Sequence, residues 1–79
     1  MHIERILSFD VHPLGLYMVV SFGLSAKVYS LENKNISLIF SCTMTNIKQV
    51  RYSPSGAEMI LFSSRQIKVL DAYSFRIKH

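Results

Sequence analysis

Two side chains able to exchange protons stand close together near the amino-terminal end of the chain. Asp10 and His12 are separated by one residue, so in an extended strand they lie on the same face. A carboxylate beside an imidazole suits acid–base catalysis. The same spacing also arises where a strand ends in a turn histidine, and we favour this structural role. No serine stands in a nucleophile-elbow context, and the sequence predicts no catalytic residue and no enzyme.

The chain is poor in residues that bind metals and phosphates. None of its histidines or its cysteine has the spacing of a zinc site: His2, His12, Cys42 and His79. Its glycines are isolated turn residues and form no phosphate-binding loop: Gly15, Gly23 and Gly56. We therefore expect no metal and no cofactor. A lone cysteine forms no internal disulfide, which favours a reducing compartment.

Basic side chains near aromatic ones are the remaining candidates for contact chemistry. The net charge is +4, and it is spread without a run of like charges. A solvated face is the more common meaning of such a pattern. If these groups bind a partner, an acidic protein surface such as tubulin suits them as well as RNA does. The candidate partner-contact residues are Arg51, Arg65, Lys68 and Tyr73.

The composition indicates that the fold of this chain is incomplete by itself. Of the 79 residues, 49% are hydrophobic, which is high for a chain with so little interior. The longest uncharged stretch, residues 11–26, is too short and too broken by Pro13 to cross a bilayer, and we expect no membrane partner and no signal peptide. We expect instead that a longer parent chain or adjacent blades complete the fold.

An internal repeat organises the chain. Residues 13–31 align without a gap on residues 54–72, 41 positions later. The alignment places Pro13 on Pro54 and Gly15 on Gly56, so both copies have the turn chemistry of proline followed by glycine. Met18 falls on Met59, which predicts that both are core residues. A period near 40 residues with four strands is typical of propeller blades.

The repeat divides into short strands separated by turns. In the first copy, strands are expected at residues 6–11, 16–22, 26–31 and 36–41, joined through the polar connection 32–35. In the second copy they are expected at 47–52, 57–62 and 66–70, with a fourth beginning at 75–78. The continuous apolar run 16–22 is typical of a strand buried on both faces. The prediction is an all-β fragment of a β-propeller with about two four-stranded antiparallel blades, over residues 1–46 and 47–79.

These motifs resemble degenerate WD repeats over essentially the whole chain. Phe9–Gly15 and Val50–Gly56 look like the first half of such a repeat, and Asp71 occupies the aspartate position of the Trp-Asp signature, with Leu70 replacing the tryptophan. The usual Gly-His pair is missing from residues 43–46. A buried network of His, Ser, Asp and Trp is therefore not expected, and Asp71 is assigned a local role. Pro13, Gly15, Pro54, Gly56 and Asp71 are the structural turn and repeat positions.

A narrower resemblance suggests a cellular setting. The segment 11–31, with its His-Pro-x-Gly turn and Val-x-Phe strand end, is similar to a blade of cilia- and flagella-associated WD-repeat proteins. This resemblance implies a protein–protein interaction scaffold that docks or regulates inner dynein arms on doublet microtubules. It also implies axonemal proteins, tubulin and dynein-arm components as partners, in the cytoskeleton of a cilium or flagellum. The alternative is a WD-repeat scaffold of an RNA-associated complex, although nucleic acid is the less favoured partner.

Overall fold

The computed structural model describes residues 5–32 and 35–78, which form strands and turns and no α-helix. Two of the candidate metal ligands, His2 and His79, lie outside the described residues, as does part of the polar connection predicted at 32–35. Over the described ranges, no helix has the length and apolar character needed to span a bilayer.

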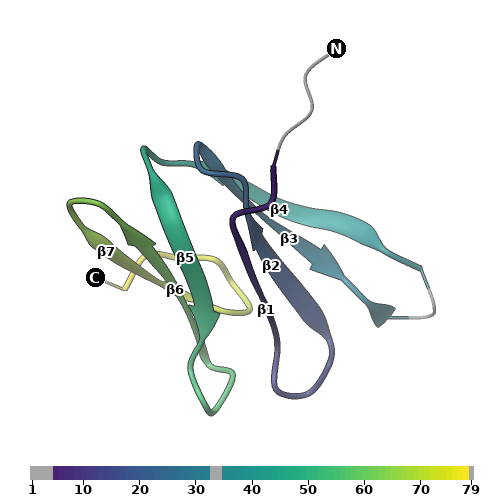
Figure 1. The fold of residues 1–79 in the computed structure, drawn as a ribbon. Coiled ribbons are helices and arrows are strands. Elements are labelled where there is room, and N and C mark those ends of the chain that lie inside the picture. Colours follow the sequence, from purple (N-terminus) through teal and green to yellow (C-terminus); the bar gives the residue numbers. More distant parts are fainter. Residues whose placement is uncertain (1–4, 33–34, 79) are drawn as a thin grey trace.

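The first sheet is a four-stranded antiparallel meander, in which each strand pairs with the next. Its strands are β1 (Ser8–Val11), β2 (Tyr17–Ser21), β3 (Ser25–Ser30) and β4 (Ser37–Thr43), in the order β1-β2-β3-β4 (Figure 1). The predicted turn between β1 and β2 closes with a bond from the Gly15 amide to the His12 carbonyl, at 2.7 Å. Gly15 has a φ of 73°, which a residue with a side chain adopts only at a cost.

The second sheet repeats this meander over fewer strands. It contains β5 (Ile47–Tyr52), β6 (Glu58–Ser63) and β7 (Ile67–Asp71), in the order β5-β6-β7. The fourth strand predicted at residues 75–78 is reduced to one antiparallel bridge between Leu70 and Ile77. The bridge is flanked by bonds from the Asp71 amide to the Arg76 carbonyl and from the Lys78 amide to the Val69 carbonyl. The prediction of an all-β chain with two successive antiparallel sheets is confirmed, with the second sheet less complete than the first.

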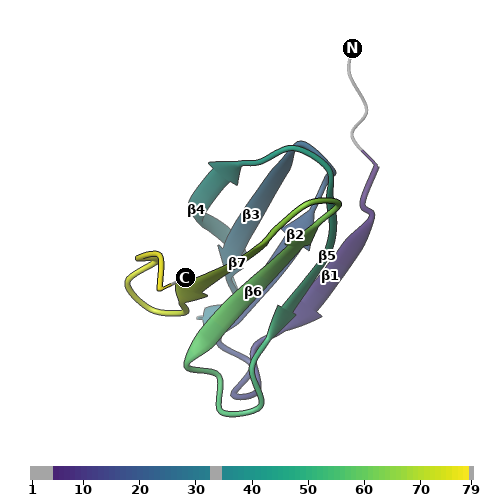
Figure 2. The same ribbon diagram turned by 90° about the vertical axis from the view of Figure 1, so that its left-hand side faces the viewer.

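The two sheets pack face to face, and the core lies between them (Figures 1 and 2). The side chains that close this space are apolar and come from both sheets, because alternate residues of each strand point to the same face. They include Val19, Ala26, Val28, Ile47, Val50, Met59, Leu61 and Leu70, each no more than 2% exposed. One shared core therefore holds the two blades together.

Burial in β2 corrects two of the sequence expectations. Val19 and Val20 are buried, but Tyr17 and Met18 are only partly so, and the strand is not covered on both faces along its length. Met59 is 0% exposed, as expected for a core residue. Its repeat counterpart Met18 points to the outer face of the first sheet, where the described chain supplies no second sheet, so the prediction was wrong for Met18 in part.

Side chains of the first sheet satisfy the open edge of β5. The Tyr52 amide donates to Asp10 Oδ2 at 2.8 Å, and the Val50 amide donates to Ser8 Oγ at 3.2 Å. From β2, the buried Ser21 hydroxyl donates to the Ile47 carbonyl at 2.7 Å. An unpaired strand edge invites pairing with other chains, and buried backbone groups are costly to leave unbonded. These bonds fix β5 against the first sheet.

Candidate partner-contact surface

The three basic contact candidates lie apart on the second sheet. Arg51 is opposite Ile60 across the β5–β6 pair and belongs to the outer face. Lys68 is opposite the fully buried Leu61, so its side chain starts from the inner face and is half-buried. Arg65 lies in the turn between β6 and β7 and is exposed. The structure does not bring these three cations together into one patch.

Tyr73 follows β7, and its side chain contacts the rest of the chain on one side and solvent on the other. It is 51% exposed. Its hydroxyl lies 3.1 Å from His12 Nε2, and its ring meets the rings of His12 and Tyr17 edge to face. The polar atom of Tyr73 is therefore engaged across the junction between the sheets, while one side of the ring remains available for contact.

His12 is the centre of an aromatic cluster between the two sheets. It is 2% exposed and meets the rings of Tyr17, Tyr52 and Tyr73 edge to face at 5.2–5.6 Å. The Leu14 amide donates to its Nδ1 at 3.1 Å, so the proton of the neutral imidazole is on Nε2. Nε2–H then donates to the Gly56 carbonyl at 3.0 Å. Both ring nitrogens are occupied, and this supports the structural role predicted for Asp10 and His12 over proton transfer.

Tyr52 carries the polar group in this cluster that is hardest to ionise. Its hydroxyl oxygen is buried and finds no hydrogen-bond partner among the described residues. Burial raises the pKa of the Tyr52 phenol far above its ordinary value, and the negative charge of Asp10 and then Tyr17 raise it further. The phenol therefore stays neutral, and the side chain contributes to the packing between the two sheets.

Close approach at Gly56 fixes the second repeat turn against His12. Gly56 has a φ of 78°, and a Cβ added there would lie 2.6 Å from His12 Nε2 and 3.3 Å from Pro13 Cδ. The two predicted turn motifs thus meet across the junction, where His12 and Pro13 of the first lie against Gly56 of the second. Pro54 lies in the turn that carries Gly56.

Asp71 has a local role, at the end of β7. Its Oδ1 accepts the amides of Tyr73 at 2.9 Å and Ser74 at 2.8 Å, which closes a tight turn. These two backbone bonds, that of Ser74 first, lower the pKa of the Asp71 carboxyl below its ordinary value. Asp71 thereby orients the segment that carries Tyr73.

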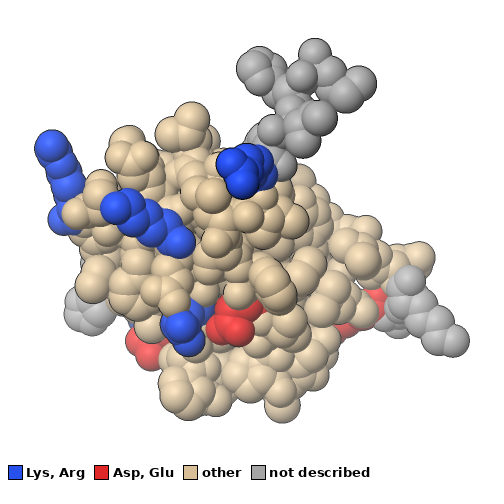
Figure 3. Space-filling view, viewed as in Figure 1, with Lys and Arg blue, Asp and Glu red and all other residues tan. Residues whose placement is uncertain are grey.

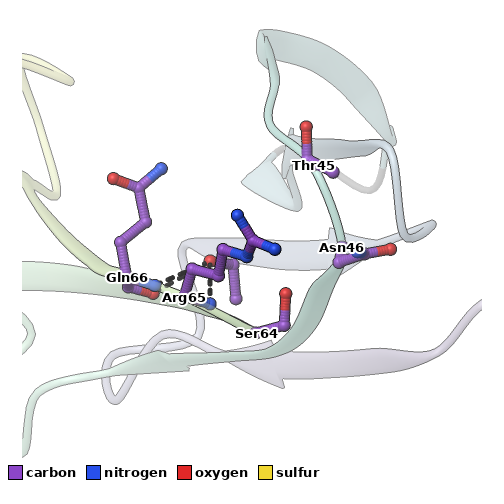
Figure 4. A pocket seen from close by; sticks show the side chains of 6 residues that line it. Thr45, Asn46, Ser64, Arg65 and Gln66 are labelled. Atoms are coloured by element: carbon purple, nitrogen blue, oxygen red, sulfur yellow. Dashed lines mark hydrogen bonds between the residues drawn. The ribbon is translucent and has the colours of Figure 1, made fainter.

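Two loops at one end of the molecule enclose a polar pocket of about 390 Å³. The loop between β4 and β5 supplies Thr45 and Asn46; the end of β6 and the turn that leads to β7 supply the rest (Figure 4). The Ser63 hydroxyl shapes the second loop by accepting the amides of Arg65 and Gln66. We call this the Arg65 pocket, lined by Thr45, Asn46, Ser63, Ser64, Arg65 and Gln66. A guanidinium among hydroxyl and amide groups suits a carboxylate or another oxyanion.

The charged groups elsewhere are sparse. Figure 3 shows isolated Lys and Arg side chains on a face that is mostly uncharged. One exposed ion pair joins Lys78 Nζ to Glu58 Oε2 at 3.7 Å. Within residues 5–32 and 35–78, no three His, Cys, Asp or Glu side chains are grouped as a metal site requires.

Sequence reasoning missed two features of this region. His12 was assigned to a turn, and its contacts with Gly56 and Tyr73 were not foreseen, because they join residues 44 and 61 positions apart. Thr45 and Asn46 were not singled out as pocket residues. A signal existed for Asn46, because asparagine is enriched at positive φ, and Asn46 has a φ of 54°.

Comparison with known proteins identifies the fold. No family model matches the chain, and no curated protein matches it significantly. Solved structures of Hsv2, a yeast β-propeller protein from Kluyveromyces lactis, do match. The Hsv2 structure with complete loop 6CD has a TM-score of 0.69 and 14% identity, over 94% of this chain and 23% of that one. Hsv2 with this loop replaced by a Gly-Ser linker has a TM-score of 0.71 and 14% identity, over 95% and 25%.

These similarities define the class of protein. The chain has the fold of a β-propeller segment, and it spans about a quarter of the length of the Hsv2 structures it resembles. The predicted likeness to propeller repeats is confirmed at the level of fold. Identity of 14% carries no partner or activity from Hsv2 to this chain.

Proposed function

We propose that the chain is part of a non-enzymatic β-propeller scaffold that binds protein partners through the loops at the end of its sheets. The Arg65 pocket is the observation that supports this most directly, since it is polar, open, and formed by the loop that connects the two sheets together with the β6–β7 turn of the second sheet. Binding residues are commonly carried on loops that a rigid sheet positions. Titratable residues of the aromatic cluster are engaged in holding the two sheets together.

An acidic protein surface is the partner that suits this pocket. Arg65 supplies a planar, permanently charged group, and the lining hydroxyls of Ser64 and Thr45 supply further donors. No aspartate or glutamate is among the residues that line the pocket. A carboxylate of a partner is therefore the complementary group.

The finer proposal places this scaffold in an axonemal complex that docks or regulates inner dynein arms on doublet microtubules. It rests on the sequence resemblance of residues 11–31 to ciliary WD-repeat proteins. The acidic surface of tubulin is compatible with the Arg65 pocket. The RNA-associated alternative relies on the net charge of +4 alone, and the wide separation of Arg51, Arg65 and Lys68 gives it no added support.

The first test is co-sedimentation with microtubules. We expect the chain to bind stabilised microtubules and to lose most of that binding when the acidic tubulin tails are removed by proteolysis. Arg65→Gln should weaken binding by about tenfold to a hundredfold, the value of one charge-assisted contact. Arg76→Gln removes an exposed cation beyond the opposite end of β7 and serves as the matched control. Equal loss in both variants would reject the pocket as the contact.

The second test addresses the cellular setting. Mass spectrometry of axonemes extracted with detergent should detect the tryptic peptide of residues 52–65, if the source organism has cilia. Its presence only in soluble or nuclear fractions would reject the axonemal proposal and leave the general scaffold in place. RNA binding that weakens steeply with added salt would favour the alternative.

A further inference from the structure

Each sheet has a mainly apolar outer face that the described residues leave largely uncovered. Residues opposite each other on antiparallel strands share a face. The outer face of the first sheet, here called the back face, is formed by Phe9, Val11, Met18, Val20, Lys27 and Tyr29. Val20, at 3% exposure, is the one buried member of this set. The outer face of the second sheet, here called the front face, is formed by Gln49, Arg51, Ile60, Phe62, Ile67 and Val69.

The internal repeat relates both open faces to the surfaces already packed together in the core. Shifting the back face by 41 positions gives the side of the second sheet that faces the junction: Val50, Tyr52, Met59, Leu61, Lys68 and Leu70, all buried except the half-buried Lys68. Shifting the front face back by 41 positions gives the side of the first sheet that covers it: Ser8, Asp10, Val19, Ser21, Ala26 and Val28. Each of the two faces that pack together inside the chain therefore has a repeat counterpart on an outer face that is open.

Exposure follows this relationship. Val50 is 1% exposed inside the junction, whereas its counterpart Phe9 is 63% exposed on the back face. Ala26 is 1% exposed, whereas its counterpart Ile67 is 59% exposed on the front face. Val20 is the exception, since it is 3% exposed on the back face and its counterpart Leu61 is 0% exposed. For Phe9 and Ile67 the difference comes from the missing cover and not from residue type, because they are at least as apolar as Val50 and Ala26. Contiguous exposed apolar surface of this kind marks an interaction site.

We propose that the occupant of each open face is a second copy of this chain, which places its back face on the front face of the first and reproduces the internal junction. The argument is the repeat itself, because the two open faces are counterparts of two surfaces that already fit each other. This inference is independent of the scaffold function and of the Arg65 pocket.

Polar groups at the edges of the open faces fit the same arrangement. In the internal junction Ser8 accepts the Val50 amide. The equivalent position on the front face is Gln49, whose side-chain oxygen accepts from the Arg51 guanidinium at 2.7 Å and would turn from it to accept the Phe9 amide of the next copy. Asp10 accepts the Tyr52 amide internally, and its counterpart Arg51 has no acceptor atom to replace it. The corresponding amide, that of Val11, is already bonded to Asp10 Oδ1 at 3.0 Å. The presence of arginine at position 51, where the first repeat has Asp10, therefore leaves no amide unbonded.

The contact between copies is heterologous, because two different faces meet. Contacts of this type repeat until they close into a ring or grow without limit. Closed propellers contain about four to eight blades, which corresponds to about two to four copies of a two-blade chain. We expect a closed ring, since the junction between blades carries the curvature of a propeller.

One-sided variants test this directly. Phe9→Lys damages the back face and Ile67→Lys damages the front face, and both positions are exposed in the single chain. Light scattering coupled to size exclusion should give a discrete oligomer of about two to four copies for the unmodified chain. Each variant alone should be monomeric. Their mixture should form a heterodimer of one copy each, because one intact back face then meets one intact front face.

Several outcomes would overturn the proposal. The unmodified chain could remain a folded monomer up to about 0.5 mM, where a contact of millimolar strength is already detectable. Either variant alone could still dimerise, which would indicate that like faces pair. The mixture could also remain monomeric. Leu14→Lys, in an exposed turn on neither face, is the control and should assemble like the unmodified chain. Circular dichroism of every variant confirms that its strands are retained.

Discussion

At the scale of single residues, Gly56 and His12 show how closely the two blades approach each other. Gly15 and Gly56 occupy the same place in the repeat and both have positive φ, at 73° and 78°. Their surroundings differ, since a Cβ at Gly15 would meet nothing within 4 Å while one at Gly56 would meet the His12 ring. Substitutions at these two glycines therefore distinguish the free-energy cost of a positive φ from the cost of a steric clash with the His12 ring.

The first prediction uses this pair. Gly15→Ala should cost about 1–2 kcal/mol of unfolding free energy, the penalty for an ordinary residue in the left-handed region. Gly56→Ala should cost about 2–4 kcal/mol, because displacing His12 also weakens a buried hydrogen bond. Urea unfolding of both variants measures the difference. Equal losses would show that His12 relaxes freely and does not join the blades.

The second prediction concerns Asp71 and pH. The pKa of its carboxyl is lowered in the folded chain, so its stabilising effect is complete above the unfolded-state pKa. The effect is lost as pH falls through the folded-state pKa. NMR titration should show the Asp71 side chain protonating at lower pH than an ordinary aspartate. Asp71→Asn keeps an acceptor for the Tyr73 and Ser74 amides, so its turn should persist without this pH dependence.

The third prediction concerns Cys42. Burial raises the pKa of its thiol, and the backbone of Ala26 and the charge of Lys68 only partly oppose this effect. The thiolate is the reactive form, so alkylation of Cys42 should be slower than that of an unfolded control peptide at the same pH. Lys68→Gln should slow it further by removing the favourable charge. A faster reaction in this variant would contradict the electrostatic effect assigned to Lys68 on the Cys42 thiol.

At the scale of elements, the junction between β1 and β5 is the main structural device of the chain. Strand β1 places Ser8 and Asp10 so that their side-chain oxygens accept amides from the open edge of β5. This arrangement replaces a strand partner with side chains. It holds two separate sheets together and prevents the edge of β5 from pairing elsewhere.

The fourth prediction tests this junction. Asp10→Ala should destabilise the chain by about 1–3 kcal/mol, because the Tyr52 amide is left without an acceptor. Asp10→Asn retains an acceptor oxygen and should recover much of the loss. Hydrogen exchange at the Tyr52 amide reports the effect locally, and it should accelerate in Asp10→Ala more than in Asp10→Asn. Unchanged exchange would contradict the role of Asp10.

At the scale of the whole molecule, the two sheets share one core and should unfold together. Met59 is fully buried between them, and it packs in the same cluster as Val28 of the first sheet. The fifth prediction is that Met59→Ala costs about 2–5 kcal/mol and lowers hydrogen-exchange protection in β3 and β6 by the same factor. Leu14→Ala, in an exposed turn, is the control. Loss confined to β6 would show that the sheets are independent.

Local chemistry in the sequence determined the strands and turns. Alternating apolar residues, Pro13 and Pro54, and the turn glycines predicted all seven strands within a few residues, and the repeat predicted two successive sheets of the propeller type. The turn role of Asp71 was also foreseen. These features depend on residues near each other in the chain, where period and backbone preference act directly.

Only the tertiary structure decided what the sheets do to each other. It placed His12 against Gly56 and Tyr73, separated Arg51 from Lys68 on opposite faces, and brought Thr45 beside Arg65 in one pocket. It also left Met18 on an open face while its counterpart Met59 was buried. The physical reason is that contacts between residues far apart in the chain depend on how two faces pack, and the period of a repeat alone does not show which faces are covered.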